Sequence, residues 1–84
     1  MTLPALTLYT RPGCGLCDLA CTNLEAMGFT FQRVNVDLDP DLRRRFGDDV
    51  PVLAAGERVL GKGSFSRARL GSLKLLLMRG SPPG

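Results

Sequence analysis

The alternation of hydrophobic and polar positions divides the first half of the chain into a strand, a helix and a second strand. Residues 3–10 form an apolar run of strand formers, which ends at Arg11-Pro12-Gly13. Apolar side chains then recur at spacings of three and four over residues 15–27, which predicts an amphipathic helix. Residues 29–36 alternate again, with a break in phase near Arg33, and predict a second strand.

The next part of the chain predicts a short helix followed by a hairpin. Asp39 is a suitable helix N-cap and precedes a proline, so a short helix is expected over residues 40–46. Residues 50–55 are apolar and predict a third strand. Residues 56–58 form a tight turn, and residues 59–60 are the hairpin partner of that strand.

A final helix completes the pattern. Ser64 is expected as its N-cap and residues 65–78 as its body. One line along this helix is expected to contain Phe65, Arg69, Leu73 and Leu76, with Leu70 and Leu77 beside it. The order of elements is therefore β-α-β-α-β-β-α. Because a β-α-β unit pairs its strands in parallel and a hairpin pairs them antiparallel, we expect an α/β fold with one mixed four-stranded sheet flanked by helices.

Composition and charge restrict the possible functions. The chain has 84 residues, 44% hydrophobic and 23% charged, which suits one globular domain over residues 1–80 with a disordered tail at residues 81–84. The net charge of +3 is spread and is not interleaved with aromatic side chains, so nucleic-acid binding is not expected. No secretory signal or membrane-spanning apolar run is visible, so we expect a cytoplasmic monomer without membrane partners.

Cys14 and Cys17 form a C-x-x-C pair between the first strand and the first helix. Cys14 is expected at the helix N-terminus, where backbone N–H groups and the nearby Arg11 cation stabilise a thiolate. Cys17 follows one helical turn later and is expected to be more buried. This arrangement predicts a dithiol in which Cys14 attacks a disulfide and Cys17 resolves the mixed disulfide that forms.

Other interpretations of the cysteines stay open. The pair could be two buried small hydrophobic residues. Cys21 is expected in the core, with a second resolving or regulatory thiol as the alternative. A binding module could use Cys14, Cys17 and Cys21 to hold zinc or an iron–sulfur cluster. Because the chain has no histidine, the further ligand would be a carboxylate such as Asp18 or would come from a second subunit, and we expect no metal. A third hypothesis is a non-catalytic adaptor that binds peptides.

Two further segments are candidate substrate contacts. Arg11 is either solvated or holds a substrate carboxylate. Gly63 and Ser64 belong to a glycine-rich turn before the last helix, which resembles an anion-binding turn. A substrate or glutathione carboxylate would suit such a turn better than a nucleotide phosphate, because no phosphate-binding motif is present.

Three groups of residues are informative when they are taken together: Leu8-Tyr9-Thr10-Arg11-Pro12-Gly13-Cys14-x-x-Cys17, Val50-Pro51 at the third strand, and the Gly61-x-Gly63 turn. In this combination the chain resembles the glutaredoxin-like family of the thioredoxin superfamily. The chain is especially similar to small bacterial members that read C-x-L-C in the cysteine pair and V-P-V-L in the second half. The resemblance spans nearly the whole chain.

The resemblance implies a thioredoxin-like, glutaredoxin-type fold and a thiol–disulfide oxidoreductase without a bound cofactor. It implies that Pro51 is in cis and faces the cysteine pair, which would leave the Val50 backbone free to pair with an extended substrate. The substrate-binding residues expected on all these grounds are Arg11, Val50, Pro51, Gly63 and Ser64. Substrates would be protein or small-molecule disulfides, and the electron donor would be glutathione or a thioredoxin-reductase-type system.

Overall fold

The structure, a computed structural model, describes residues 3–79, and the tail predicted at residues 81–84 lies outside the described residues. Within the described part, four strands and three α-helices follow one another in the predicted order, with one additional short 3-10 helix. The elements are β1 (Leu6–Thr10), α1 (Gly15–Ala26), β2 (Phe31–Asn35), η1 (Val36–Leu38), α2 (Pro40–Phe46), β3 (Val52–Ala55), β4 (Arg58–Lys62) and α3 (Arg67–Arg79).

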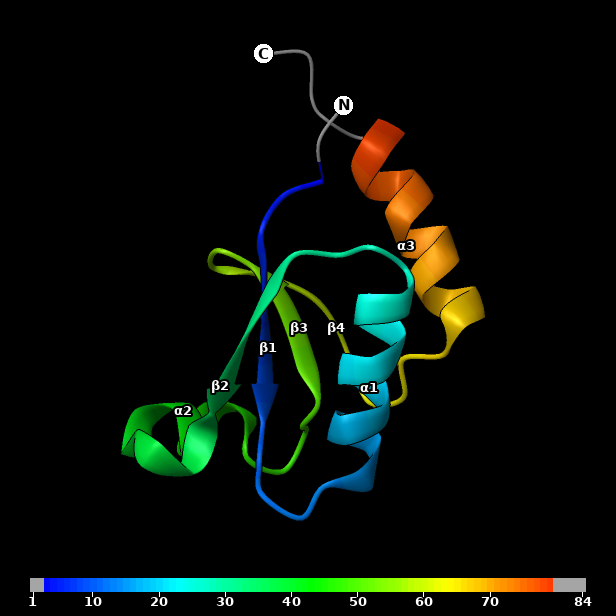
Figure 1. The fold of residues 1–84 in the computed structure, drawn as a ribbon. Coiled ribbons are helices and arrows are strands. Elements are labelled where there is room, and N and C mark those ends of the chain that lie inside the picture. Colours follow the sequence, from blue (N-terminus) through cyan, green and yellow to red (C-terminus); the bar gives the residue numbers. More distant parts are fainter. Residues whose placement is uncertain (1–2, 80–84) are drawn as a thin grey trace.

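The four strands form one mixed sheet in the order β2-β1-β3-β4. β1 and β2 pair in parallel, and α1 makes the crossover between them. β3 runs antiparallel to β1, and β4 runs antiparallel to β3. The predicted mixed sheet is confirmed, and Figure 1 shows α1 and α3 together on one side of it.

α1 and α3 cover one face of the sheet because alternate side chains of β1 point toward them. Leu6 and Leu8 of β1 pack with Leu24 of α1 and Leu70 of α3 in one hydrophobic core. Phe65, which precedes α3, belongs to the same core and is only 2% exposed. This packing holds α1 against the sheet, with its first turn near the end of β1 (Figure 1).

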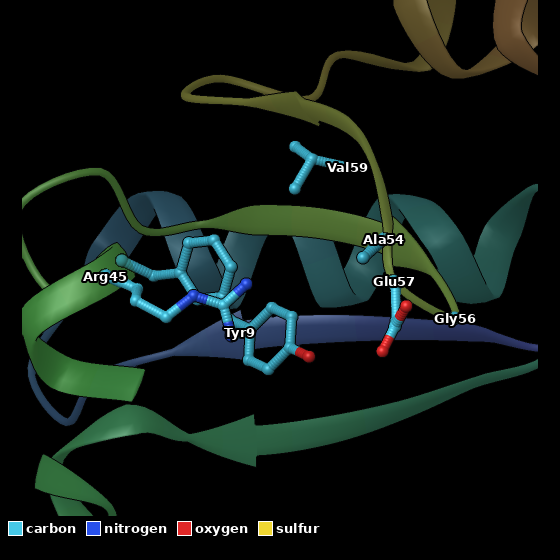
Figure 2. Close-up of a pocket in the computed structure, with 7 residues that line it drawn as sticks. Tyr9, Arg45, Ala54, Gly56, Glu57 and Val59 are labelled. Carbon is cyan, nitrogen blue, oxygen red and sulfur yellow. The ribbon is translucent and has the colours of Figure 1, made fainter. Parts of the chain in front are cut away.

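The opposite face of the sheet is covered only in part. Tyr9 of β1 points to this face and stacks on Phe46 of α2, with the ring centroids 4.7 Å apart. A pocket of about 430 Å³ remains between the end of α2 and the β3–β4 hairpin (Figure 2). The pocket is lined by Tyr9, Arg45, Phe46, Ala54, Gly56, Glu57 and Val59. The predicted site residues are not among them.

The start of α3 differs from the prediction. The helix begins at Arg67, and its first turn is capped by Ser66, whose Oγ accepts a hydrogen bond from the Arg69 N–H at 3.1 Å. Ser64 is exposed and lies outside the helix, so its assignment as the N-cap was wrong. The reason is tertiary: Phe65 is buried, and its carbonyl accepts a hydrogen bond from Asn23 of α1 at 2.9 Å.

The side of α3 that faces the core also differs. Leu70 is buried, and Leu73 and Leu77 pack against the core, whereas Leu76 is 58% exposed. The predicted line through Phe65 and Leu76 was therefore wrong, because Phe65 lies before the helix and does not share its periodicity. Leu70 and Leu77, which were expected beside that line, lie on the side that meets the core.

The other elements differ from prediction only at their ends. β2 stops at Asn35 and continues as η1, and β3 begins at Val52, two positions later than expected. β4 extends to Lys62. The short helix is confirmed, since Asp39 is its N-cap and accepts hydrogen bonds from two backbone N–H groups of the first turn.

Candidate functional site

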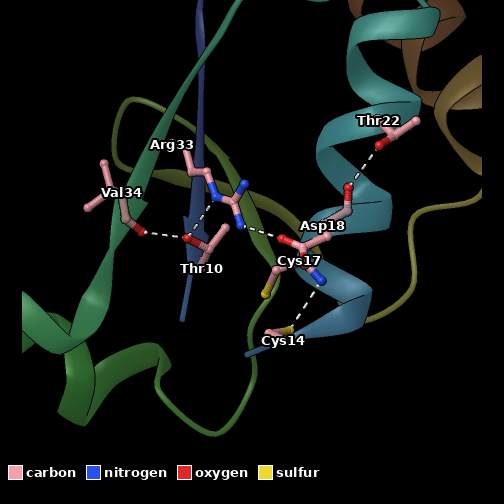
Figure 3. A network of polar contacts seen from close by, with 7 residues as sticks. All are labelled: Thr10, Cys14, Cys17, Asp18, Thr22, Arg33 and Val34. Atoms are coloured by element: carbon pink, nitrogen blue, oxygen red, sulfur yellow. Dashed lines mark hydrogen bonds and ion pairs between the residues drawn. The ribbon is translucent and has the colours of Figure 1, made fainter. Parts of the chain in front are cut away.

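Cys14 is the N-cap of α1. Its backbone is extended, with φ −96° and ψ 104°, and its Sγ accepts a hydrogen bond from the Cys17 N–H at 3.1 Å (Figure 3). Gly13 has a φ of 74°, which residues with a side chain rarely adopt, so the turn from β1 into α1 favours glycine at this position. The predicted position of Cys14 at the helix N-terminus is confirmed, and a backbone N–H group points at its sulfur.

The two thiols of the pair differ in exposure. Cys14 is half-buried, whereas Cys17 is completely buried, and neither is part of a disulfide in this structure. Burial raises the pKa of Cys17 from 9.0 to about 12, and the neighbouring Cys14 acts in the same direction. Cys17 is therefore a neutral thiol near pH 7, and Cys14 is the more accessible thiol of the pair.

Arg33 of β2 places a positive charge that acts on the inner thiol, which is the buried thiol of Cys17. Its guanidinium donates a hydrogen bond to the Asp18 carboxylate at 2.6 Å and, through Nε, to Thr10 Oγ1 at 3.4 Å (Figure 3). The charge of Arg33 lowers the pKa of Cys17, which opposes the effect of burial. Arg33 reaches this position because it is the register partner of Leu8, so both side chains lie on the α1 side of the sheet.

The contribution of Arg33 was not predicted from the sequence. The feature of the sequence that indicated this role is the break in the alternation of the second strand, which places an arginine on the face that α1 covers. Asp18 was considered only as a metal ligand, and the structure pairs it with Arg33. The two residues are 15 positions apart in the chain, and only the parallel pairing of β1 and β2 brings them together.

Arg11 is engaged on the other side of the cysteine turn. Its Nε lies 3.0 Å from the Asp37 carboxylate, and its NH1 donates a hydrogen bond to the Gly47 carbonyl at 3.2 Å. These contacts join the end of β1 to η1 and to the end of α2. The role of Arg11 toward a thiolate or a substrate carboxylate stays a prediction.

The remaining predicted contacts lie at the same end of the sheet as the cysteine pair. Tyr9 pairs with Val52 in antiparallel register, so the residues before β3 lie beside those that follow β1. The Val50–Pro51 peptide bond is cis, as the resemblance implies. Gly63 N–H donates a hydrogen bond to the Pro51 carbonyl at 2.9 Å, which places the turn after β4 next to this segment.

Cys21 lies in the hydrophobic core, as expected, and is 8% exposed. Burial raises its pKa as well. Within residues 3–79, no three cysteine, histidine or acidic side chains gather as a group that could hold a metal ion. Among these residues, Cys14, Cys17 and Cys21 therefore do not come together as such a group.

Comparison with known proteins gives a family for this arrangement. The family described as "Glutaredoxin-like domain (DUF836)" matches residues 5–75. A curated relative, the glutaredoxin-like protein NrdH of Salmonella typhimurium, is 40% identical over 57 residues. These residues make up 63% of this chain and 70% of the relative.

Two solved structures share the fold. A structural-genomics target protein from X. campestris has a TM-score of 0.73 and 35% identity, and the match covers 92% of this chain and 99% of that one. The glutaredoxin-like NrdH-redoxin of Escherichia coli has a TM-score of 0.63 and 28% identity, over 82% of this chain and 93% of that one. Its structure is described as the basis of a thioredoxin-like activity profile. The thioredoxin-like, glutaredoxin-type fold predicted from the sequence is confirmed.

Proposed function

Because the chain belongs to the glutaredoxin-like domain family, we propose that it is a dithiol oxidoreductase in which Cys14 is the nucleophile and Cys17 the resolving thiol. One observation supports this assignment above the others. The reachable sulfur of Cys14 sits at the N-terminus of α1 and accepts a hydrogen bond from the backbone of Cys17, whose own sulfur is buried one turn deeper.

The reaction proceeds in two exchanges. The Cys14 thiolate attacks one sulfur of a substrate disulfide, the substrate S–S bond breaks, and the leaving thiolate takes up a proton. The Cys17 thiol then loses its proton and attacks Cys14 Sγ, which releases the second substrate thiol. Two electrons pass to the substrate, and the protein is left with a Cys14–Cys17 disulfide that an external reductant must reduce.

The buried, neutral state of Cys17 gives the two exchanges an order. A neutral thiol is a poor nucleophile, so Cys17 does not compete with Cys14 for the substrate. During the second exchange the Cys17 thiolate must form in a buried site, and the Arg33 guanidinium, oriented by Asp18, stabilises that charge. Arg33 therefore acts in resolution and not in the first attack.

The substrate lies across the sheet end where the predicted contacts meet. The segment at Val50 and Pro51 borders the cysteine turn and would support an extended substrate segment, while Gly63 and Ser64 would contact its far side. Arg11 would bind a substrate carboxylate only by sharing its contact with Asp37. The substrate class is a protein or small-molecule disulfide.

A single-turnover experiment tests the two cysteine roles without an electron donor. The fully reduced protein is mixed with a disulfide-linked peptide, and the products are identified by mass spectrometry. Wild-type protein should reduce the peptide, Cys14→Ser should not react, and Cys17→Ser should stay joined to half of the peptide through Cys14. Cys21→Ser is the matched control and should behave as wild type. Reduction of the peptide by Cys14→Ser would refute the proposal.

The electron donor is tested by multiple turnover. Glutathione with glutathione reductase is compared with a thioredoxin reductase, each with NADPH. The thioredoxin-like activity profile described for the E. coli protein supports the reductase as the faster donor for this chain. Turnover that depends on glutathione alone would reverse this order.

A further inference from the structure

The C-terminal half of α3 carries large apolar side chains on its outer side as well as on the side that packs on the protein. Leu70, Leu73 and Leu77 face the core, because they are three and four positions apart. Three large apolar side chains of the same half point to solvent: Leu75 is 66% exposed, Leu76 58% and Met78 38%. At about 100° per residue, these three are spread around the outer side of the helix and do not form a single stripe.

From Arg58 onward, every charged side chain of the chain is basic. No acidic residue follows Glu57, whereas six basic residues do. They are Arg58, Lys62, Arg67, Arg69, Lys74 and Arg79.

Three basic side chains of α3 donate hydrogen bonds within the protein, and the acceptors are neutral oxygen atoms. Arg67 donates a hydrogen bond to the Asn23 side-chain oxygen, and Lys74 donates to the Met27 carbonyl. Arg69 donates to two backbone carbonyls. A carbonyl or amide oxygen satisfies a hydrogen bond without cancelling the charge, so the positive potential of α3 persists at the surface.

This surface lies away from the cysteine pair. Figure 1 shows the C-terminal end of α3 at the pole of the molecule opposite the turn between β1 and α1, which carries Cys14. A partner bound at the end of α3 would leave the cysteine site open. The surface is therefore independent of the proposed redox function.

We propose that Leu75, Leu76 and Met78, with Arg79, form a docking surface for an anionic lipid bilayer, in place of the absence of membrane partners that was expected from the sequence. Apolar side chains enter the boundary between headgroups and acyl chains, and neighbouring cations bind the lipid phosphates. The contact is peripheral: within residues 3–79 no helix has the length and hydropathy to cross a membrane.

Two other occupants fit the surface less well. In a dimer formed through this surface, two copies of α3 would face each other. Because α3 has no acidic residue, their positive charges would repel and oppose pairing. A groove on an acidic protein would take one stripe of a helix, whereas the exposed side chains are distributed around it. A fluid lipid interface accepts apolar side chains in every direction.

Vesicle co-sedimentation tests the proposal. Vesicles of phosphatidylcholine alone are compared with vesicles of equal parts phosphatidylcholine and phosphatidylglycerol, at low and high salt. The reduced full-length protein should sediment with the anionic vesicles at low salt and much less with the neutral ones. Leu75→Ser combined with Leu76→Ser should lower the partition coefficient about ten-fold or more, because two exposed apolar side chains are removed.

Matched variants separate this surface from unspecific attraction. Leu38→Ser removes an equally apolar side chain, 83% exposed on η1, and should leave binding unchanged. Arg79→Gln should lower binding about five-fold. Arg44→Gln makes the same change in net charge on α2 and should have little effect. Circular dichroism confirms that each variant is folded.

Three results would overturn the proposal. The first is no binding of wild-type protein to anionic vesicles at low salt, which would leave an acidic protein as the partner. The second is an equal loss of binding in the Leu38 and Leu75/Leu76 variants. The third is a dimer in analytical ultracentrifugation that disappears in the Leu75/Leu76 variant, which would identify the surface as a contact between two copies of the chain.

Discussion

The backbone N–H of Cys17 donates a hydrogen bond to the Sγ of Cys14 at 3.1 Å. This contact joins the two members of the cysteine pair before any bond forms between their sulfurs. The two residues differ in burial, since Cys14 is half-buried and Cys17 is completely buried.

Alkylation should distinguish the three cysteines. In the folded, reduced protein at about pH 8, a thiol reagent should modify Cys14 roughly a hundred-fold faster than Cys17 or Cys21, because the latter two are buried and their pKa values are raised. Peptide mapping by mass spectrometry after short exposure measures each rate. Equal rates at Cys14 and Cys17 in protein that is still folded would contradict the assignment of an outer and an inner thiol.

The free energy of unfolding should decrease at alkaline pH because the Cys17 thiol is buried. Its pKa is near 9.0 when unfolded and about 12 when folded, so its contribution is fully present below pH 9 and is lost as the pH rises toward 12. The stability advantage of reduced wild type over Cys17→Ala should shrink by up to about 1.4 kcal/mol per pH unit above pH 9. Urea denaturation across this range measures it. A constant difference would show that the Cys17 thiol is not held neutral by burial.

Removal of the Arg33 charge should slow the second exchange. Arg33→Gln is expected to reduce the rate at which the mixed disulfide on Cys14 is resolved about three- to ten-fold, since the forming Cys17 thiolate loses a nearby cation that is itself partly solvated. Rapid acid quench with mass spectrometry separates this step from the first attack. Arg33→Lys keeps the charge and should recover most of the rate. A change confined to the first attack would exclude this role.

The buried side chain of Asn23 should contribute more to stability than an exposed polar side chain of the same helix. It is 7% exposed, donates a hydrogen bond to the Phe65 carbonyl at 2.9 Å and accepts one from Arg67, so it fastens α3 to α1. Asn23→Ala should destabilise the fold by about 1 to 3 kcal/mol in urea denaturation, because the buried carbonyl loses its partner. Thr22→Ala, at the adjacent exposed position, is the control and should change stability by less than about 0.5 kcal/mol.

The N-cap of α3 can be tested with two serines. Ser66→Ala should lower stability by about 0.5 to 2 kcal/mol, because the Arg69 N–H loses its side-chain acceptor. Ser64→Ala, at the position that the sequence pattern favoured, should be close to neutral. The reverse order of effects would restore Ser64 as the cap.

The elements that could be predicted from sequence are those held by local interactions. The turn at Gly13, the N-cap position of Cys14 and the N-cap Asp39 depend on residues within a few positions of one another, and each was predicted correctly. The pairing of the strands also followed, because a β-α-β unit and a hairpin each allow few arrangements.

The features that escaped prediction depend on contacts between distant residues. α3 begins at Arg67 because the burial of Phe65 and its bond to Asn23, 42 positions earlier, outweigh the local signal at Ser64. The exposure of Leu76 follows from the packing of Leu70, Leu73 and Leu77 on the core, which sets the side of the helix that faces the sheet.

The sequence by itself therefore determined the order of elements, the mixed sheet and the cysteine pair at the first turn of a helix, because these follow from backbone preferences and hydrophobic periodicity along the chain. Only the tertiary structure decided which cation acts on the inner thiol and which apolar side chains face solvent. Arg33 meets Asp18 through strand register, and Leu75 and Leu76 stay exposed because a helix can bury only one side against a single layer of protein.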